Sequence, residues 1–373
     1  MNAKEILRKL NLMIIILLIL CNFAIGQMEV FQVVPTERIP DILDTISTSV
    51  QENINKINSL EGEIQVLWRK EYKGEKAKRI FESRTNAVGD IPNRIAELTE
   101  STTTFSCDLN KGLYYTKASR ESPSLYVDMS DDMSNNRDLG TKSMPWYSIS
   151  ILTPDNYLHS SPNRMRDGKV VQRRGVKEKA ERDGSCLSNG QHSIFDPKNL
   201  INAGNPVWLH FPRIIERIKE RGNYVVDEYS LRIEQGELDG KVQYRVHEPI
   251  KIGPEGDILW EIKTYSTDVG YNMISSKRTH TDGQLVNQRS IEYNSVQGVY
   301  FPKRIIYEVF DYNDGSLRSR KERTFKNIRL NAVIPPEKFT YKNLSLTNGD
   351  VFIDKILEKE YTYQEGKLIE VEK

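Results

Sequence analysis

The residues of this chain whose types and spacing could support chemistry are few and lie far apart. Its histidines are His159, His192, His210, His247 and His280. None of them forms an HExxH or HxH pair, the spacings that present two imidazoles to one metal ion, and no CxxC pair occurs. We therefore expect no metal site, and we interpret His247 as a solvated side chain on the polar face of a strand.

Motifs for nucleophilic catalysis and for phosphate binding are also absent. The chain has no GxSxG nucleophile elbow, no GxxxxGK[ST] loop and no GxGxxG after a predicted strand. Asp131 and Asp132 lie in a polar stretch, where a solvated acidic pair is far commoner than a glycosidase dyad. We predict a protein without a cofactor and without enzymatic activity. Because active sites can assemble from residues distant in sequence, a hydrolase with its site in residues 125–200 remains an alternative.

The N-terminal residues carry the order of features that directs export. A basic segment precedes an unbroken apolar run, residues 12–21, and small residues occupy positions 24 and 26, before Gln27. The run is shorter than the ~20 residues that span a bilayer, which favours a cleaved signal peptide, residues 1–26, over a membrane anchor. Leu20 disfavours lipidation of Cys21. We predict a mature protein that begins at Gln27 and works in the periplasm or as a secreted protein.

Two cysteines remain in this mature protein, Cys107 and Cys186. In an oxidising compartment they could form a disulfide that closes a long loop. Two separate thiols, one of them buried on a strand, fit the sequence equally well. A disulfide would require their Cα atoms to lie within ~7 Å of each other.

The charge of the chain argues against a nucleic-acid partner. Lysine and arginine number 53 and aspartate and glutamate 52, which gives a net charge of +1, whereas nucleic-acid-binding domains usually present a basic surface. A hydrophobic fraction of 38% is enough to build a core. The sequence does not predict an oligomeric state.

The first element after the signal is an amphipathic helix over residues 41–60. Its apolar residues recur at steps of three and four and form one stripe: Ile42, Leu43, Ile46, Val50, Ile54, Ile57 and Leu60. Gly62 is expected to end it. A second amphipathic helix is expected at about 206–221.

Much of the remaining chain alternates apolar and polar residues with a period of two, as half-buried strands do. Turn sequences such as Asn313-Asp314-Gly315 separate the runs, and strands joined by short turns run antiparallel. We predict a mainly β, α+β fold: one curved antiparallel sheet, an incomplete β-barrel wrapped around the two helices. A β-sandwich is the alternative.

The domain organisation follows from where this pattern holds. We expect one domain over residues 27–365, with a loop-rich insertion at about 125–200, because residues 128–144 and 163–193 are polar and poor in apolar residues. Residues 366–373 are expected to form a charged tail.

Apolar side chains from several elements would share the interior of this fold. They are Ile46, Val50, Ile54, Trp68, Phe105, Leu231, Tyr244 and Trp260. Each projects from the apolar side of its own element. Packed together, they form an ordinary core; partly apart, they line a cavity for an apolar ligand. The sequence leaves both interpretations open.

Short phrases near both ends resemble a known superfamily. Residues 59–64, Ser-Leu-Glu-Gly-Glu-Ile, step from the helix into a strand, and Tyr300-Phe301-Pro302 enters a late strand. Residues 325–339 then contain an Asn…Ile-Pro…Phe phrase, and Phe339 to Tyr363 match a closing phrase with Gly349, Val351 and Asp354. This order is similar to that of the LolA/LolB-like periplasmic lipoprotein-carrier superfamily, and most similar to its long exported members.

The resemblance implies an incomplete β-barrel that helices close around an apolar cavity. It also implies non-catalytic binding of acyl chains, lipid or lipoprotein, with peripheral membrane contact. The alternative from another functional class is a structural or protein-interaction domain of the same fold, in which the core is packed shut.

Overall fold

The computed structural model of this protein describes residues 31–84, 93–121, 124–126, 146–166, 169–179, 207–252 and 256–372. The predicted signal peptide, residues 1–26, lies outside these ranges, so its cleavage stays a prediction. Cys107 is described and buried, whereas Cys186 is not described, and their pairing stays a prediction as well.

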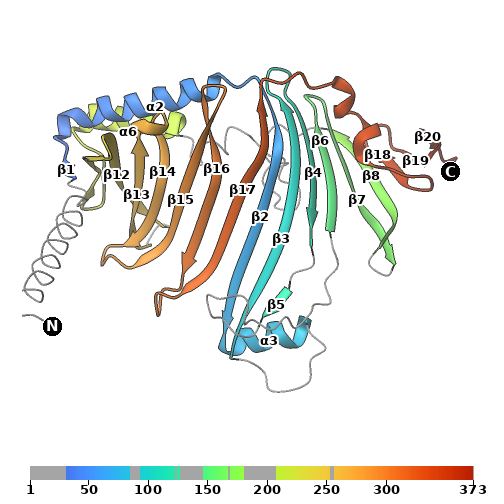
Figure 1. Ribbon diagram of the computed structural model, residues 1–373, viewed down its shortest axis with the longest axis horizontal. Coiled ribbons are helices and arrows are strands. Elements are labelled where there is room, and N and C mark those ends of the chain that lie inside the picture. The colour runs from blue at the N-terminus through green and yellow to red at the C-terminus, as the bar shows by residue number, and fades with distance from the viewer. Residues whose placement is uncertain are drawn as a thin grey trace, which may run out of the picture.

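One continuous curved sheet organises the chain (Figure 1). In spatial order, one half runs β1 (Gln32–Val33), β11 (Arg232–Leu238), β12 (Lys241–Lys251), β13 (Ile258–Ser266), β14 (Asn272–His280), β15 (Leu285–Val296), β16 (Val299–Phe310) and β17 (Leu317–Leu330). The other half runs β2 (Ser59–Lys73), β3 (Arg94–Asp108), β4 (Leu113–Arg120), β6 (Trp146–Leu152), β7 (Asn156–Arg166), β8 (Lys169–Lys179), β18 (Val351–Asp354), β19 (Lys359–Gln364) and β20 (Lys367–Glu370). A short strand, β5 (Ser124–Tyr126), also pairs with β3, and β9 (Val225–Val226) and β10 (Tyr229–Ser230) form a separate hairpin.

The pairing confirms the predicted curved, mostly antiparallel sheet. Short turns join most sequential neighbours, and the pairing of β8 with β18 is parallel. Among the described residues, β1 and β20 stand at opposite ends and do not pair with each other, so the sheet is open. The β-sandwich alternative is wrong, because the strands belong to one sheet rather than to two that face each other.

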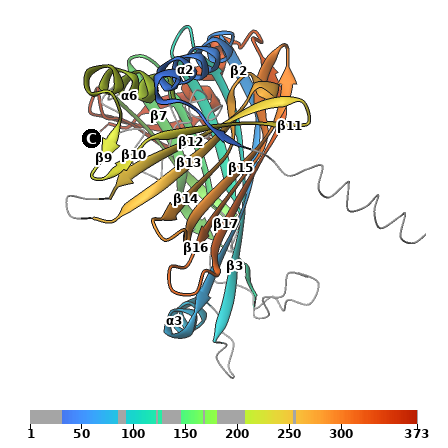
Figure 2. The same cartoon turned by 90° about the vertical axis from the view of Figure 1, so that its left-hand side faces the viewer.

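Three helices pack on this sheet in the described part of the chain: α2 (Ile39–Asn55), α3 (Gly74–Arg84) and α6 (Val207–Arg221). Figure 2 shows α2 and α6 beside each other at one end of the strands, and α3 at the other end. The first predicted helix therefore stops earlier than expected. Leu60 lies in β2, where it pairs with Cys107 and Leu330.

Gly62, expected to end that helix, lies inside β2 instead. A Cβ atom at this position would collide with Cδ1 of Ile328 and lie 3.0 Å from the Phe105 ring, so a glycine fits this crowded place without displacing either side chain. The signal that suggested a helix end is in fact the signal of a crowded strand.

Two further expectations differ from the structure. Three strands, β6, β7 and β8, lie within the stretch where a loop-rich insertion was expected. Their polar composition misled the interpretation, because several of their serines are buried in the sheet, Ser150 and Ser160 among them. At the C-terminus, part of the expected charged tail forms β20, which pairs with β19.

Apolar clusters cover opposite faces of the sheet at its two ends. We call the face on which α2 and α6 pack the inner face, and the other the outer face. The largest cluster lies on the inner face between these helices and the strands from β11 to β3. A second cluster contains Ile149 and Ile151 of β6, which pair with residues of the outer row of β4, and Phe339 and Leu344 from the C-terminal segment cover them.

Candidate functional site

The candidate site is the inner face beneath α2 and α6. The stripe of α2 is completely covered there: the exposed fractions of Ile46 and Val50 are 0%, and that of Ile54 is 2%. From α6, Phe211 joins them and meets the ring of Tyr265 edge to face, with centroids 5.7 Å apart. The two helices thus share one apolar layer with the sheet.

Most of the residues predicted to share the interior do meet in this layer. Five of these predicted residues belong to the buried cluster: Ile46, Val50, Ile54, Phe105 and Leu231. Tyr244 packs at its edge, stacked on Tyr271 at a centroid distance of 6.2 Å, and burial raises its pKa. The alternation pattern therefore identified the correct face on β3, β11 and β12.

The two tryptophans of the prediction lie elsewhere. Trp68 is on the inner face but outside the cluster, with the Lys70 ammonium 3.7 Å from its ring centroid. Trp260 is on the outer face, where it meets Tyr229 edge to face and lies under Arg232. The prediction that Trp260 faces α2 is therefore wrong.

The cause of this error is a charged network on the inner face of β13. Register places Glu261 and Lys263, not Trp260, on the side of the helices. Lys263 Nζ lies 2.7 Å from Glu261 Oε2 and 3.5 Å from Glu248 Oε2. Arg278 donates two hydrogen bonds to Glu261, at 2.8 and 3.0 Å. These side chains are inside because they neutralise one another.

Burial alone would raise the pKa of Glu261, but Lys263 and Arg278 more than offset it and hold this pKa below its usual value. The exposed fractions of Glu248 and Lys263 are only 2% and 4%. The sequence signal for this network is the pair of opposite charges, Glu261 of β13 and Arg278 of β14, at paired positions. The sequence alone does not show that they pair, because the register of the two strands must be known first.

Within the described residues, α2 and α6 are each tied to the sheet by a polar contact in addition to their apolar faces. Asn53 of α2 forms two hydrogen bonds of 3.0 Å with the backbone of Tyr300. His210 of α6 places Nε2 2.8 and 2.9 Å from the carboxylate oxygens of Glu248. The remaining contact between helices and sheet within the described residues is largely hydrophobic.

Next to the apolar layer, the inner face carries charged, polar and aromatic side chains. One cross-strand row reads Val246, Lys263, Ser276, Arg289, Tyr307, Lys321, Trp68 and Thr99, from β12 to β3. Arg323 belongs to the adjacent row, where it pairs with Ile305 of the apolar cluster on one side and with Val66 on the other. The apolar layer thus ends at a border of cationic and aromatic side chains.

The cations of this border are partly withdrawn from water. Burial, together with the charges of Arg323 and Lys70, lowers the pKa of Lys321 to about 8. Burial also lowers the pKa of Arg323, with a contribution from Arg289. Arg289 lies over the ring of Tyr307, 5.3 Å from its centroid.

We expect replacement of Lys321 by methionine to stabilise the protein at pH 7 by about 1 kcal/mol. The pKa of Lys321 is lower in the folded than in the unfolded chain, so the unfolded chain binds more protons between these two values. Stability should therefore rise as the pH rises from 8 towards 10.5, as the folded chain escapes the cost of a charged Lys321. Urea unfolding at several pH values measures this. A variant that keeps the wild-type slope over this range would contradict it.

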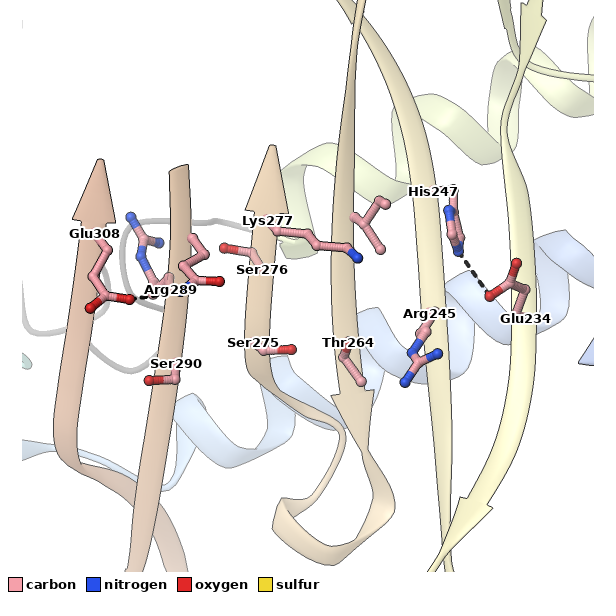
Figure 3. A pocket seen from close by; sticks show the side chains of 12 residues that line it. Glu234, Arg245, His247, Thr264, Ser275, Ser276, Lys277, Arg289, Ser290 and Glu308 are labelled. Carbon is pink, nitrogen blue, oxygen red and sulfur yellow. Dashed lines mark hydrogen bonds and ion pairs between the residues drawn. The ribbon is translucent and has the colours of Figure 1, made fainter. Parts of the chain in front are cut away.

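A hollow of about 400 Å³ lies on the outer face of the same strands (Figure 3). Polar side chains line it, including Glu234, Arg245 and Lys277, and the helices lie behind the sheet. His247, expected to be solvated, is only 6% exposed there. Its Nε2 lies 3.1 Å from Glu234, and burial lowers its pKa against the opposing effect of that carboxylate.

The described ranges contain neither a cluster of metal-ligating side chains nor a membrane-spanning helix. No group of three or more histidine, cysteine, aspartate or glutamate side chains there could hold a metal ion. None of the helices within those ranges has the length and apolar character needed to cross a bilayer.

Comparisons with known proteins add a likeness of fold. No protein-family model and no curated protein matches the chain. Among solved structures, it is similar to a DUF1329 family protein from Desulfovibrio piger, with a TM-score of 0.34 and 9% identity over 81% of this chain and 99% of that one. It is also similar to a LolA superfamily protein from Nitrosomonas europaea, with a TM-score of 0.28 and 11% identity over 80% and 99% of the two chains.

A third match is a domain from Vibrio parahaemolyticus described as an outer membrane lipoprotein-sorting protein, with a TM-score of 0.30 and 7% identity over 81% and 99% of the two chains. The superfamily that the sequence phrases resemble is therefore among the matches.

Proposed function

We propose that this protein is an exported, non-catalytic binding protein that holds an acyl chain, as free lipid or as part of a lipoprotein, between α2, α6 and the inner face of the sheet. The predicted residues Ile46, Val50, Ile54, Phe105 and Leu231 would contact the chain, with Tyr244 at the edge. Cleavage before Gln27 would release the protein outside the cytoplasm.

The observation that carries this proposal is the placement of the apolar layer in an open sheet. The layer is covered by two amphipathic helices rather than by a second sheet, and its margin consists of half-buried apolar side chains such as Val66, Tyr244 and Tyr271. A helix held by one polar contact and an apolar face can be displaced by a ligand that offers the same apolar contacts. Burial contributes about 0.8 kcal/mol per CH₂ group, so a long chain could bind without a charged contact.

A structural or interaction domain is the second candidate, and a specific observation favours it. Ile46 and Val50 are fully covered without any ligand, as in an ordinary close-packed core. The two candidates differ in their response to added lipid. In a binding protein, α2 and α6 must separate from the sheet to admit the ligand, whereas in a packed domain they stay in place.

Titration of the purified mature protein with a fluorescent long-chain fatty acid tests the proposal. We expect saturable binding by the wild type, and at least a tenfold weaker affinity, about 1.4 kcal/mol, for Leu231→Trp. Leu231 is 6% exposed within the cluster, so a larger ring there occupies the space of the ligand.

Leu67→Trp is the matched control. Leu67 is 40% exposed and lies on the outer row of β2, so the same substitution should leave binding unchanged. Absence of saturable binding by the wild type would refute the binding function and leave the packed domain.

A further inference from the structure

The inner face contains a small group of cations that the charged network beneath α6 does not neutralise. That network joins Glu248, Lys263, Glu261 and Arg278 through ion pairs. Three strands further on from β14, Lys321 and Arg323 project from the same side of β17, and within the described ranges no carboxylate forms an ion pair with either of them. Half-buried cations without a counter-charge are costly in a folded protein.

The neighbours of Lys321 and Arg323 define what would fit beside them. Across β16, Ile305 pairs with Arg323 and Tyr307 pairs with Lys321; across β2, Val66 and Trp68 occupy the corresponding positions. Phe325, the next inner residue of β17, is buried in the apolar cluster. Lys321 Nζ lies 5.2 Å from the centroid of the Trp68 ring. The two cations therefore stand at the border where the apolar layer ends.

From this geometry we infer that Lys321 and Arg323, flanked by Trp68 and Tyr307, bind the anionic headgroup of an amphiphile whose hydrocarbon chain occupies the apolar layer. The inference rests on the function proposed above and specifies its ligand class: a single-chain or multi-chain lipid that ends in a carboxylate or phosphate. A guanidinium donates paired hydrogen bonds to either group, and an ammonium adds a point charge.

The opposite face of β17 shows that the arrangement is not a general property of this strand. There, Arg320 lies 3.3 Å from Glu308, and Glu322 accepts from Arg304 at 2.7 Å. On this face, Arg320 of β17 and Arg304 of β16 thus each have a carboxylate partner on the neighbouring strand. The inner cations instead follow one another along β17, and the charge of Arg323 helps to lower the pKa of Lys321.

The test compares two fluorescent ligands with the same long chain, a fatty acid and its primary amide. We expect the wild-type protein to bind the acid about tenfold more tightly than the amide at pH 7. The double variant Lys321→Met/Arg323→Met should bind both ligands equally, with the affinity for the amide unchanged. The control double variant Arg318→Met/Lys326→Met changes the net charge by the same amount on the exposed outer side of β17 and should keep the preference.

Each other outcome has a definite meaning. Equal binding of acid and amide by the wild type would overturn the headgroup site and leave the proposed function intact, whereas binding of neither would remove both. A preference that persists in the inner double variant would also overturn it. Inorganic phosphate, titrated by calorimetry, separates a lipid headgroup from a free anion: binding as tight as that of the fatty acid would assign the cations to free anions instead.

Discussion

Replacement of Ile54 by aspartate should cost the protein about 4 kcal/mol or more of its free energy of unfolding. Ile54 is 2% exposed in α2 and belongs to the apolar cluster that the helix shares with the sheet. The change removes a large buried side chain and introduces a carboxylate into a cluster of apolar side chains. A loss of this size is a large fraction of the free energy of unfolding of most domains. We therefore expect the variant to lose its cooperative unfolding transition at 25 °C, which circular dichroism in urea measures.

Thr48→Asp is the matched control for this variant, because Thr48 is an exposed residue of the same helix. It should change stability by no more than about 0.5 kcal/mol. If Ile54→Asp unfolds at the wild-type urea concentration, α2 is not part of the cooperative core. Such a result would mean that α2 is already displaced from the sheet in solution.

The sequence predicted the elements that are apolar on one side and polar on the other. The stripe of α2 and the alternation in β3, β11 and β12 each assign one face, and burial of that face is the dominant favourable contribution to folding. A curved open sheet with helices on one side follows from these faces and from the short turns. The order of the pairing, in which β2 and β3 lie between β17 and β4, does not follow from local pattern.

The prediction failed where charged residues are buried by pairing. In β13, Ile258, Trp260 and Ile262 look like the core face, yet Glu261 and Lys263 point towards α6. Single-strand alternation cannot distinguish these cases, because the cost of burying a charge depends on partners from other strands. The cationic border of Lys321 and Arg323 was missed for another reason: charged residues occupy both faces of this part of β17, so its sequence marks neither face as the inner one.

The network beneath α6 also accounts for the second large effect that we expect. Replacement of Glu248 by glutamine should lower the free energy of unfolding by about 3 kcal/mol. The Glu248 carboxylate is 2% exposed and contacts both His210 of α6 and Lys263 of β13. Without its charge, Lys263 keeps one of its two carboxylate partners, and His210 of α6 meets a neutral amide in place of a carboxylate, which weakens this contact with the sheet.

A double variant shows whether this loss comes from the unbalanced charge rather than from altered packing. Glu248→Gln/Lys263→Met removes both charges, so urea unfolding at pH 7 should recover at least half of the stability lost in the single variant. Glu237→Gln, on an exposed residue of β11, should stay within about 0.5 kcal/mol of the wild type. If the double variant is as unstable as the sum of its single changes, the two side chains are not energetically coupled, and the contact with His210 must account for the effect of Glu248.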